Sequence, residues 1–198
     1  MIALGLTGLL YLFTAIALPM GYMTNDDHGI QNALSGFTTG TPYPYHQFIN
    51  CILGYLLSFF YRMLPQIQWW YVMSILCMLT GIYYMYRSWL ILCRTEDAGR
   101  IMTYLPIAFC SFFLWPYYLS RSAFTVVPVI FALGFLTSLL LPGKGRIRIR
   151  DILIPCLACL FGSLIRYETG MVLACYLSLC VFYYCVREEG WNRKMAAA

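Results

Sequence analysis

Residues 69–93 read WWYVMSILCMLTGIYYMYRSWLILC, an apolar stretch in which Arg87 is the one charged residue. A helix that crosses a membrane needs about 20 mostly apolar residues, so this stretch predicts a membrane-spanning helix. The same reasoning extends to the whole chain, because hydrophobic residues make up 61% and charged residues 11% of its 198 residues. An ordinary soluble domain has roughly 25% charged residues. The composition therefore excludes a soluble enzyme, a DNA-binding domain, a disordered chain and a small secreted disulfide scaffold.

Further apolar runs lie on both sides of residues 69–93. The shortest, 152–165, rises only about 21 Å as a helix against a hydrocarbon core of ~30 Å. We expect either that this helix extends into its flanking loops or that the Arg166 side chain snorkels toward the headgroups. We predict an all-α, polytopic membrane protein with about six transmembrane helices plus one interfacial helix, in a single transmembrane domain over residues 1–198. The predicted spans are residues 2–20, 69–93, 101–119, 123–141, 152–165 and 170–186.

Basic residues indicate how these spans are oriented. Cytoplasmic loops of polytopic proteins carry an excess of lysine and arginine. We therefore expect the loops 94–100 and 142–151 and the tail 187–198 in the cytoplasm, and the turns 120–122 and 166–169 outside. The basic residues concerned are Arg94, Arg100, Lys144, Arg146, Arg148, Arg150, Arg187, Arg193 and Lys194.

Residues 46–64 leave two topologies open. If this segment spans the membrane, the polar loop before it is cytoplasmic, whereas if it lies in the interface, that loop is outside. His46, Asn50 and Gly54 are spaced to share one helical face. The polar content of the segment, which comes from His46, Gln47, Asn50, Ser58 and Arg62, favours the interface. We therefore expect an outer loop over residues 21–68 that contains an interfacial helix. Both ends of the chain would then lie in the cytoplasm, as in a multi-pass protein of a bacterial plasma membrane.

Under this topology, the outer face collects ionisable side chains at the membrane edge, where such residues are functional candidates. A carboxylate can act as a general base toward a hydroxyl group, and a pair of carboxylates can hold a divalent cation that neutralises a phosphate leaving group. Arginines bind phosphate through bidentate hydrogen bonds. Together these side chains predict a lipid-phosphate substrate. The candidates are Asp26, Asp27, His46, Arg121, Arg166 and Glu168.

The paired residues among these candidates also have structural interpretations. Asp26 and Asp27 can cap a short helix that begins near Gly29, since aspartate is a favoured N-cap residue. Arg166 and Glu168 are two positions apart and so do not face each other on one helix. Either of them can instead pair with a neighbouring span.

The single candidates have plain interpretations as well. Arg121 can end a helix while its side chain reaches the headgroups, and His46 can be an ordinary interfacial histidine. The aromatic triplet at 69–71 fits a belt of tryptophan and tyrosine at the membrane interface. None of these roles needs a ligand.

The order of motifs adds a resemblance. A first span is followed by paired acids at 25–27, by an aromatic and proline stretch at 43–46, and by a helix that ends at Leu64 before the next span at Trp69. This order resembles the N-terminal part of the glycosyltransferase C superfamily, whose members are polytopic enzymes that use polyprenyl-phosphate sugars. Members commonly have more spans, so the resemblance leaves two expectations open, that the chain is an N-terminal fragment of such an enzyme or that it is a degenerate member.

The chain is also similar to uncharacterised bacterial multipass proteins that carry the acidic motif together with S-G-x-x-T-G-x-P and I-R-x-E, here at 35–42 and 165–168. In the superfamily the acid of the first loop is the usual catalytic base or metal ligand, which would fall on Asp26 or Asp27. Members often carry a further acid in a later outer loop. The turn at 120–122 has none, so only Glu168 could take that place.

The resemblance implies a membrane glycosyltransferase that moves a sugar from a polyprenyl-phosphate donor to an acceptor at the outer face. Asp26 or Asp27 would be the base or the ligand of a divalent cation, Arg121 and Arg166 would hold the donor phosphate, and the other two candidates would complete the site. The alternative is a non-enzymatic multipass protein, either a transporter or flippase component or an assembly partner for lipid-linked sugars. It requires the same arginines but not the acid pair. Both hypotheses place the chain in a lipid bilayer, and neither involves nucleic acid.

Overall fold

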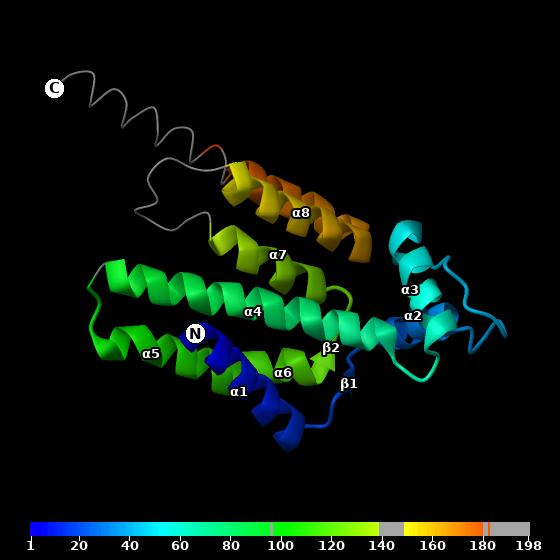
Figure 1. Cartoon of the computed structure of the whole chain (residues 1–198), viewed down its shortest axis with the longest axis horizontal. Helices are drawn as coiled ribbons and strands as arrows, with labels where there is room; N and C mark the ends of the chain where they lie inside the picture. The colour runs from blue at the N-terminus through cyan, green and yellow to red at the C-terminus, as the bar shows by residue number, and fades with distance from the viewer. Residues whose placement is uncertain (96, 139–148, 180–181, 183–198) are drawn as a thin grey trace.

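A computed structural model describes residues 1–95, 97–138, 149–179 and 182. The described elements are helices apart from two short strands, so the all-α class is confirmed (Figure 1). In chain order they are α1 (Ile2–Ala17), β1 (Gly21–Tyr22), α2 (Asn25–Ser35), α3 (Cys51–Met63), α4 (Trp69–Thr95), α5 (Arg100–Phe109), the π-helix η1 (Cys110–Leu114), α6 (Trp115–Ser120), β2 (Arg121–Ser122), α7 (Val127–Thr137) and α8 (Ile149–Ile165). Residues 167–179 form a further helix after α8.

The central element is α4, the longest described helix. It packs most extensively against α7, and α7 in turn packs against α8. The first helix, α1, packs against α4 and α6. Figure 1 shows that α7 and α8 lie on one side of α4. Helices α1, α5 and α6 lie on its other side, and α2 and α3 lie beyond one of its ends.

The bundle has two chemically different ends. At the first, called the Trp70 end here, the indole of Trp70 at the start of α4 bonds to Asp27 of α2. At the second, called the Arg94 end, Met1, Arg94 and Arg100 line one cleft. The helices α1, α4 and α5 to α6 therefore run alternately between the two ends, in the order predicted for the spans.

Two of the described helices are long and apolar enough to cross a membrane, namely Trp69–Thr95 and the continuous helix Arg100–Ser120. The second contains the π-helix η1 just before Pro116, whose missing N–H removes a hydrogen bond from the helical ladder. The number of six spans stays a prediction, because the other apolar helices are shorter. These are Ile2–Ala17, Cys51–Met63, Val127–Thr137 and Leu153–Ile165.

The first predicted span, 2–20, continues past the C-terminal end of the helix that the structure shows. Helix α1 stops at Ala17, and Leu18 has an extended backbone with φ −129° and ψ 146°. Leu18 precedes Pro19, and the residue before a proline is disfavoured in the α conformation because of a clash with the proline ring.

The helices that correspond to the predicted spans 123–141 and 152–165 begin at residues other than those predicted. Helix α7 begins at Val127, because the preceding residues form a turn in which the Val126 N–H donates to the Ala123 carbonyl at 2.9 Å. Helix α8 begins at Ile149, so it does extend into the loop before it, whereas its end at Ile165 is the predicted one. Residues 139–141, and 180, 181 and 183–186 of the last predicted span, lie outside the described residues.

The segment 46–64 is helical only from Cys51, so the prediction that His46, Asn50 and Gly54 share a helical face is wrong. Asn50 is the N-cap instead, and its Oδ1 accepts a hydrogen bond from the Ile52 N–H at 3.0 Å. Both ends of α3 contact the Trp70 end of the bundle. The Asn50 N–H donates to the Leu164 carbonyl of α8 at 2.9 Å, and the Tyr61 hydroxyl accepts from the Trp70 N–H at 3.1 Å. Helix α3 therefore lies across this end.

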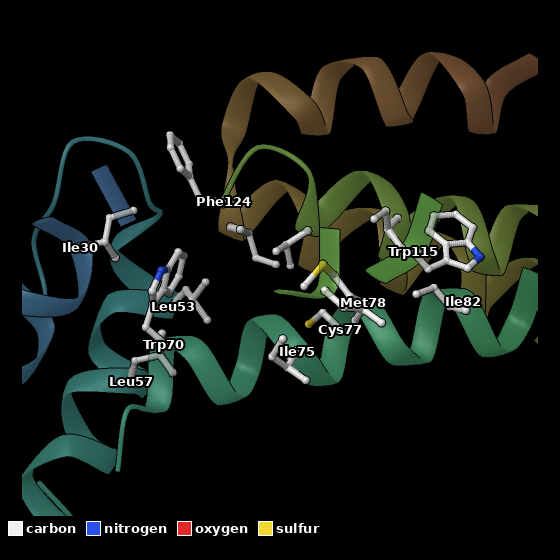
Figure 2. Packing of buried hydrophobic residues seen from close by; sticks show 14 of the residues in the cluster. Ile30, Leu53, Leu57, Trp70, Ile75, Cys77, Met78, Ile82, Trp115 and Phe124 are labelled. Carbon is white, nitrogen blue, oxygen red and sulfur yellow. The ribbon is translucent and has the colours of Figure 1, made fainter. Parts of the chain in front are cut away.

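Apolar side chains join α3 to α4 and continue along the bundle. Figure 2 shows Trp70 beside Leu53 and Leu57 of α3, with Met78 and Ile82 further along α4. Trp70, Met78 and Ile82 have no exposed surface. This continuous core holds α3 in place and fixes the position of the loops around it.

The tightest helix contact lies between Gly81 of α4 and Gly134 of α7. A Cβ atom at Gly134 would collide with the Gly81 backbone, and a Cβ atom at Gly81 would collide with the backbone of Ile130 and Phe131. The two helices therefore touch backbone to backbone, which only glycine permits. Small residues at helix contacts are typical of membrane bundles.

Candidate functional site

Two loops far apart in the chain meet at the Trp70 end. Strands β1 and β2 pair in parallel, with Gly21 opposite Arg121 and Tyr22 opposite Ser122. The Met23 N–H extends the pairing by donating to the Ser122 carbonyl at 2.8 Å. This pairing places the acidic loop that follows β1 beside the turn that follows β2.

Asp27 is the residue that joins these loops. Its side chain is completely buried, and its Oδ1 accepts hydrogen bonds from Trp70 Nε1 at 3.2 Å and from the Phe124 N–H at 3.0 Å. Its Oδ2 accepts from Thr24 Oγ1 at 2.7 Å. Burial raises the pKa of Asp27 even though these hydrogen bonds oppose the shift. The Asp27 carboxylate thus connects α2, α4 and the segment before α7.

The helix that contains the acid pair begins earlier than predicted. It starts at Asn25 rather than near Gly29, and its N-cap is Thr24, whose Oγ1 accepts from the Asp27 N–H at 3.4 Å. Capping by the acids themselves is therefore wrong. Asp26 and Asp27 lie in the first turn, where the helix dipole favours negative charge.

Asp26 is exposed and is the accessible carboxylate of the pair. Its charge acts on His46, which is half-buried in the segment before α3. Burial lowers the pKa of His46 although the Asp26 charge opposes the shift, so the imidazole is neutral near pH 7. A Cβ atom on Gly29 would lie 3.6 Å from His46 Nε2, which places the imidazole against α2.

Two phenylalanines connect His46 to Arg166. The rings of His46 and Phe48 have centroids 5.5 Å apart, and those of Phe48 and Phe124 are 5.3 Å apart. The Arg166 guanidinium lies 4.8 Å from the centre of the Phe124 ring, a distance typical of a cation–π contact. Phe124 therefore contacts Arg166 with its ring while its backbone bonds to Asp27.

Arg166 and Glu168 form an ion pair, contrary to the expectation that they do not face each other. Arg166 Nε and a terminal guanidinium nitrogen donate to Glu168 Oε2 at 2.8 and 2.6 Å. The expectation assumed one continuous helix, but Arg166 interrupts the helices and Glu168 lies in the first turn of the next one. The side chains are 28% and 71% exposed, so the pair is open to water.

Arg121 is the candidate that the structure does not bring to the others. Its exposed guanidinium lies 5.8 Å from the ring centre of Tyr117. The remaining five candidates are connected to Phe124 either directly or through one another and Phe48, and we call this group the Phe124 site. It consists of Asp26, Asp27, His46, Phe48, Phe124, Arg166 and Glu168.

The sequence did not indicate Phe48 and Phe124 of the site, or Trp70, which bonds to Asp27. The expectation of an interfacial belt at 69–71 is wrong for Trp70, because its side chain is wholly buried. Its indole N–H donates a hydrogen bond to Asp27, which lies 43 positions earlier in the chain. Phe124 lies 97 positions after Asp27. No local pattern links such distant positions.

The acid pair does not present two free carboxylates to a cation, because the Asp27 oxygens already accept three hydrogen bonds. Across the described ranges, no three side chains of His, Cys, Asp or Glu gather as a metal site. Comparison with protein-family models, curated proteins and solved structures gives no match for the chain. Its function is therefore argued from the geometry of the Phe124 site.

Proposed function

We propose that the chain is a multi-pass membrane glycosyltransferase that uses a polyprenyl-phosphate sugar at the Phe124 site. The observation that carries this proposal is the accessible Arg166 guanidinium at one end of an apolar helical bundle. It is connected through the rings of Phe124 and Phe48 to His46, on which the charge of the exposed Asp26 acts. A guanidinium suits a phosphate, and a carboxylate suits proton removal from a hydroxyl group.

The charges at the opposite end support the orientation. Arg94 and Arg100 lie at the Arg94 end, and cytoplasmic loops carry an excess of arginine and lysine. This charge pattern supports an orientation in which the Trp70 end, and with it the Phe124 site, would lie on the outer side of the membrane. Helix α3, which lies across that end, would then be the interfacial helix of the outer loop 21–68.

The proposed reaction divides the roles between the residues. The acceptor hydroxyl attacks the anomeric carbon of the donor sugar and passes its proton to Asp26, while the bond between that carbon and the phosphate oxygen breaks. Arg166 stabilises the departing polyprenyl phosphate. An exposed ion pair contributes only about 0–1 kcal/mol, so a phosphate can displace Glu168 from Arg166. Asp27 positions the first turn of α2 and does not touch substrate.

The other candidates take supporting roles in this proposal. His46 and the displaced Glu168 would hydrogen-bond to sugar hydroxyls, and Arg121 would meet the donor phosphate as it approaches along the surface. Should the reaction use a divalent cation, Asp26 would hold that cation together with the donor phosphate instead of accepting the proton.

One observation favours the alternative, a non-enzymatic carrier of lipid-linked sugars. A cavity of about 380 Å³ lies between α4, α5 to α6 and α7, beside the π-helix. Its lining is almost entirely apolar and includes Trp89, Pro106 and Cys110. Interrupted helices beside a cavity are typical of transporters, and this cavity would take an isoprenoid chain. A carrier would not need the Asp26 carboxylate.

The test of the enzyme proposal is the Asp26→Asn variant. We expect release of polyprenyl phosphate from short-chain polyprenyl-phosphate hexoses, measured by mass spectrometry, to fall by about 10²–10⁴-fold, the usual contribution of a general base. The matched control is Asp97→Asn, another exposed aspartate, at the Arg94 end, which should leave the rate unchanged. Equal rates for wild type and Asp26→Asn, both folded, would contradict the proposal, and no release by the wild type would favour the carrier.

The orientation is tested separately by cysteine labelling. In a background that lacks the nine native cysteines, Asn32→Cys in α2 should react with an impermeant maleimide added outside intact cells. The control is Gly99→Cys, exposed in the loop before α5, which should react only after permeabilisation. The reverse pattern would place the Phe124 site in the cytoplasm.

A further inference from the structure

The Arg94 end contains a cleft of about 590 Å³ that the proposed reaction does not use. It lies where the start of α1, the end of α4 and the start of α5 meet. Three arginines line it, with Arg87 and Arg94 contributed by α4 and Arg100 by α5. Arg87 and Arg94 are seven positions apart, so they project from the same face of the helix.

The three arginines are not neutralised by a carboxylate in the part of the chain that the structure describes. There the ion pair is Arg166–Glu168, at the opposite end of the bundle. The acidic residue among the cleft residues is Asp97, and it forms no ion pair with the three arginines. Converging guanidinium groups repel one another, so an anion bound between them would relieve the repulsion.

Apolar side chains line the cleft beside the arginines. They include Ile2 of α1, Leu90 and Ile91 of α4, and Tyr104 of α5. An inorganic phosphate would need only the arginines, whereas a phospholipid would bring its headgroup to the arginines and its acyl chain to the walls. An excess of arginine in cytoplasmic loops explains basic residues at this end, but it does not explain why three arginines from two helices line the same cleft.

We propose that this cleft binds the phosphate headgroup of an anionic membrane phospholipid, with Arg87, Arg94 and Arg100 as its ligands. Basic pockets between transmembrane helices on the cytoplasmic side are suited to such headgroups. The inference rests on the proposed membrane placement but not on sugar transfer, because none of its residues belongs to the Phe124 site.

The test measures binding to the full chain in an uncharged detergent, through the rise in thermal unfolding midpoint that a ligand of the folded state produces. Dioleoyl phosphatidic acid should raise the midpoint, while dioleoyl phosphatidylcholine and inorganic phosphate at the same concentrations should not. Each arginine is expected to contribute about fivefold in affinity, so Arg87→Gln/Arg94→Gln/Arg100→Gln should bind phosphatidic acid about 100-fold more weakly. The control is Arg62→Gln, which removes an exposed arginine outside the cleft and should bind like wild type.

Several results would overturn the inference. The first is equal binding of phosphatidic acid by the triple variant and wild type. The second is a rise in the midpoint with phosphatidylcholine equal to that with phosphatidic acid. The third is an equal rise with inorganic phosphate, which would mean that the ligand is a soluble anion and not a lipid. Should the triple variant fail to fold, Arg100→Gln alone should still bind about fivefold more weakly. Asp26→Asn should bind phosphatidic acid normally, which separates this inference from the transfer reaction.

Discussion

Replacement of Asp27 by alanine is expected to lower the free energy of unfolding by about 3–5 kcal/mol, among the largest effects that single substitutions produce. The variant removes the acceptor for the Trp70 indole N–H and the Phe124 backbone N–H, which bond to it at 3.2 and 3.0 Å. A buried donor left without an acceptor costs about 1–3 kcal/mol, and two are created here. Thermal and denaturant unfolding followed by circular dichroism in detergent would measure the loss.

Two variants serve as controls for Asp27→Ala. Asp27→Asn keeps the acceptor oxygen for Trp70 and Phe124, so it should remain within about 1–2 kcal/mol of wild type. Asp26→Ala removes the neighbouring exposed carboxylate and should change stability by less than about 1 kcal/mol. If Asp26→Ala and Asp27→Ala were equally destabilising, the hydrogen bonds of Asp27 would not be the cause.

The same position predicts a pH dependence. Burial raises the pKa of Asp27 above its ordinary value of 3.8, so the folded state holds this proton more tightly than the unfolded state. The stability that the protonated group contributes is complete below pH 3.8 and is lost as the pH rises through the raised pKa. The stability of wild type relative to Asp27→Asn should therefore fall as the pH rises above 3.8 and through the raised pKa. A difference that stays constant or increases with pH would contradict the shift.

Alanine at Gly81 or Gly134 is expected to destabilise the bundle by about 2–3 kcal/mol, and leucine at either position by more. The two helices touch backbone to backbone at this crossing, so an added Cβ atom must push α4 and α7 apart. This separation would disturb the most extensive helix contact of the bundle. The thermal unfolding midpoint and the yield of monodisperse protein in detergent are the measurements.

The matched control for this crossing is Gly8→Ala in α1, because a Cβ atom there meets nothing within 4 Å. Alanine is a better helix former than glycine by about 1 kcal/mol, so this variant should be neutral or more stable than wild type. The sign of the effect thus separates the contact from helix propensity. Equal destabilisation by Gly8→Ala and Gly134→Ala would show that the close approach of α4 and α7 is not the cause of the effect.

The helices themselves could be predicted from the sequence because apolar runs and helix breakers are local signals. Residues 69–93 correspond to α4, and the end of α8 at Ile165 was also predicted. The errors at Ala17 and Val127 come from the prolines at 19 and 128, which limit a helix even when the apolar run continues through them. Hydropathy alone does not contain this information.

The candidate site was predicted as a list of residues but not as an arrangement. Asp26, Arg166 and Glu168 were found because ionisable side chains are rare in this chain. The separation of the acid pair into the exposed Asp26 and the buried Asp27 depends on the partners Trp70 and Phe124, which lie far along the chain. The Arg166–Glu168 pair was missed because it depends on a helix interruption that spacing rules do not describe.

The hydrogen bond between Asp27 and Phe124, which spans 97 positions, also bears on how the chain is made. At a synthesis rate of about 5–20 residues per second, Phe124 leaves the ribosome roughly 5–20 seconds after Asp27. During that interval the carboxylate lacks one of its donors, and β1 lacks the strand that it pairs with. The acidic loop therefore closes only after residue 124 has emerged, and a nascent chain arrested before residue 121 would keep it open to water and to proteases.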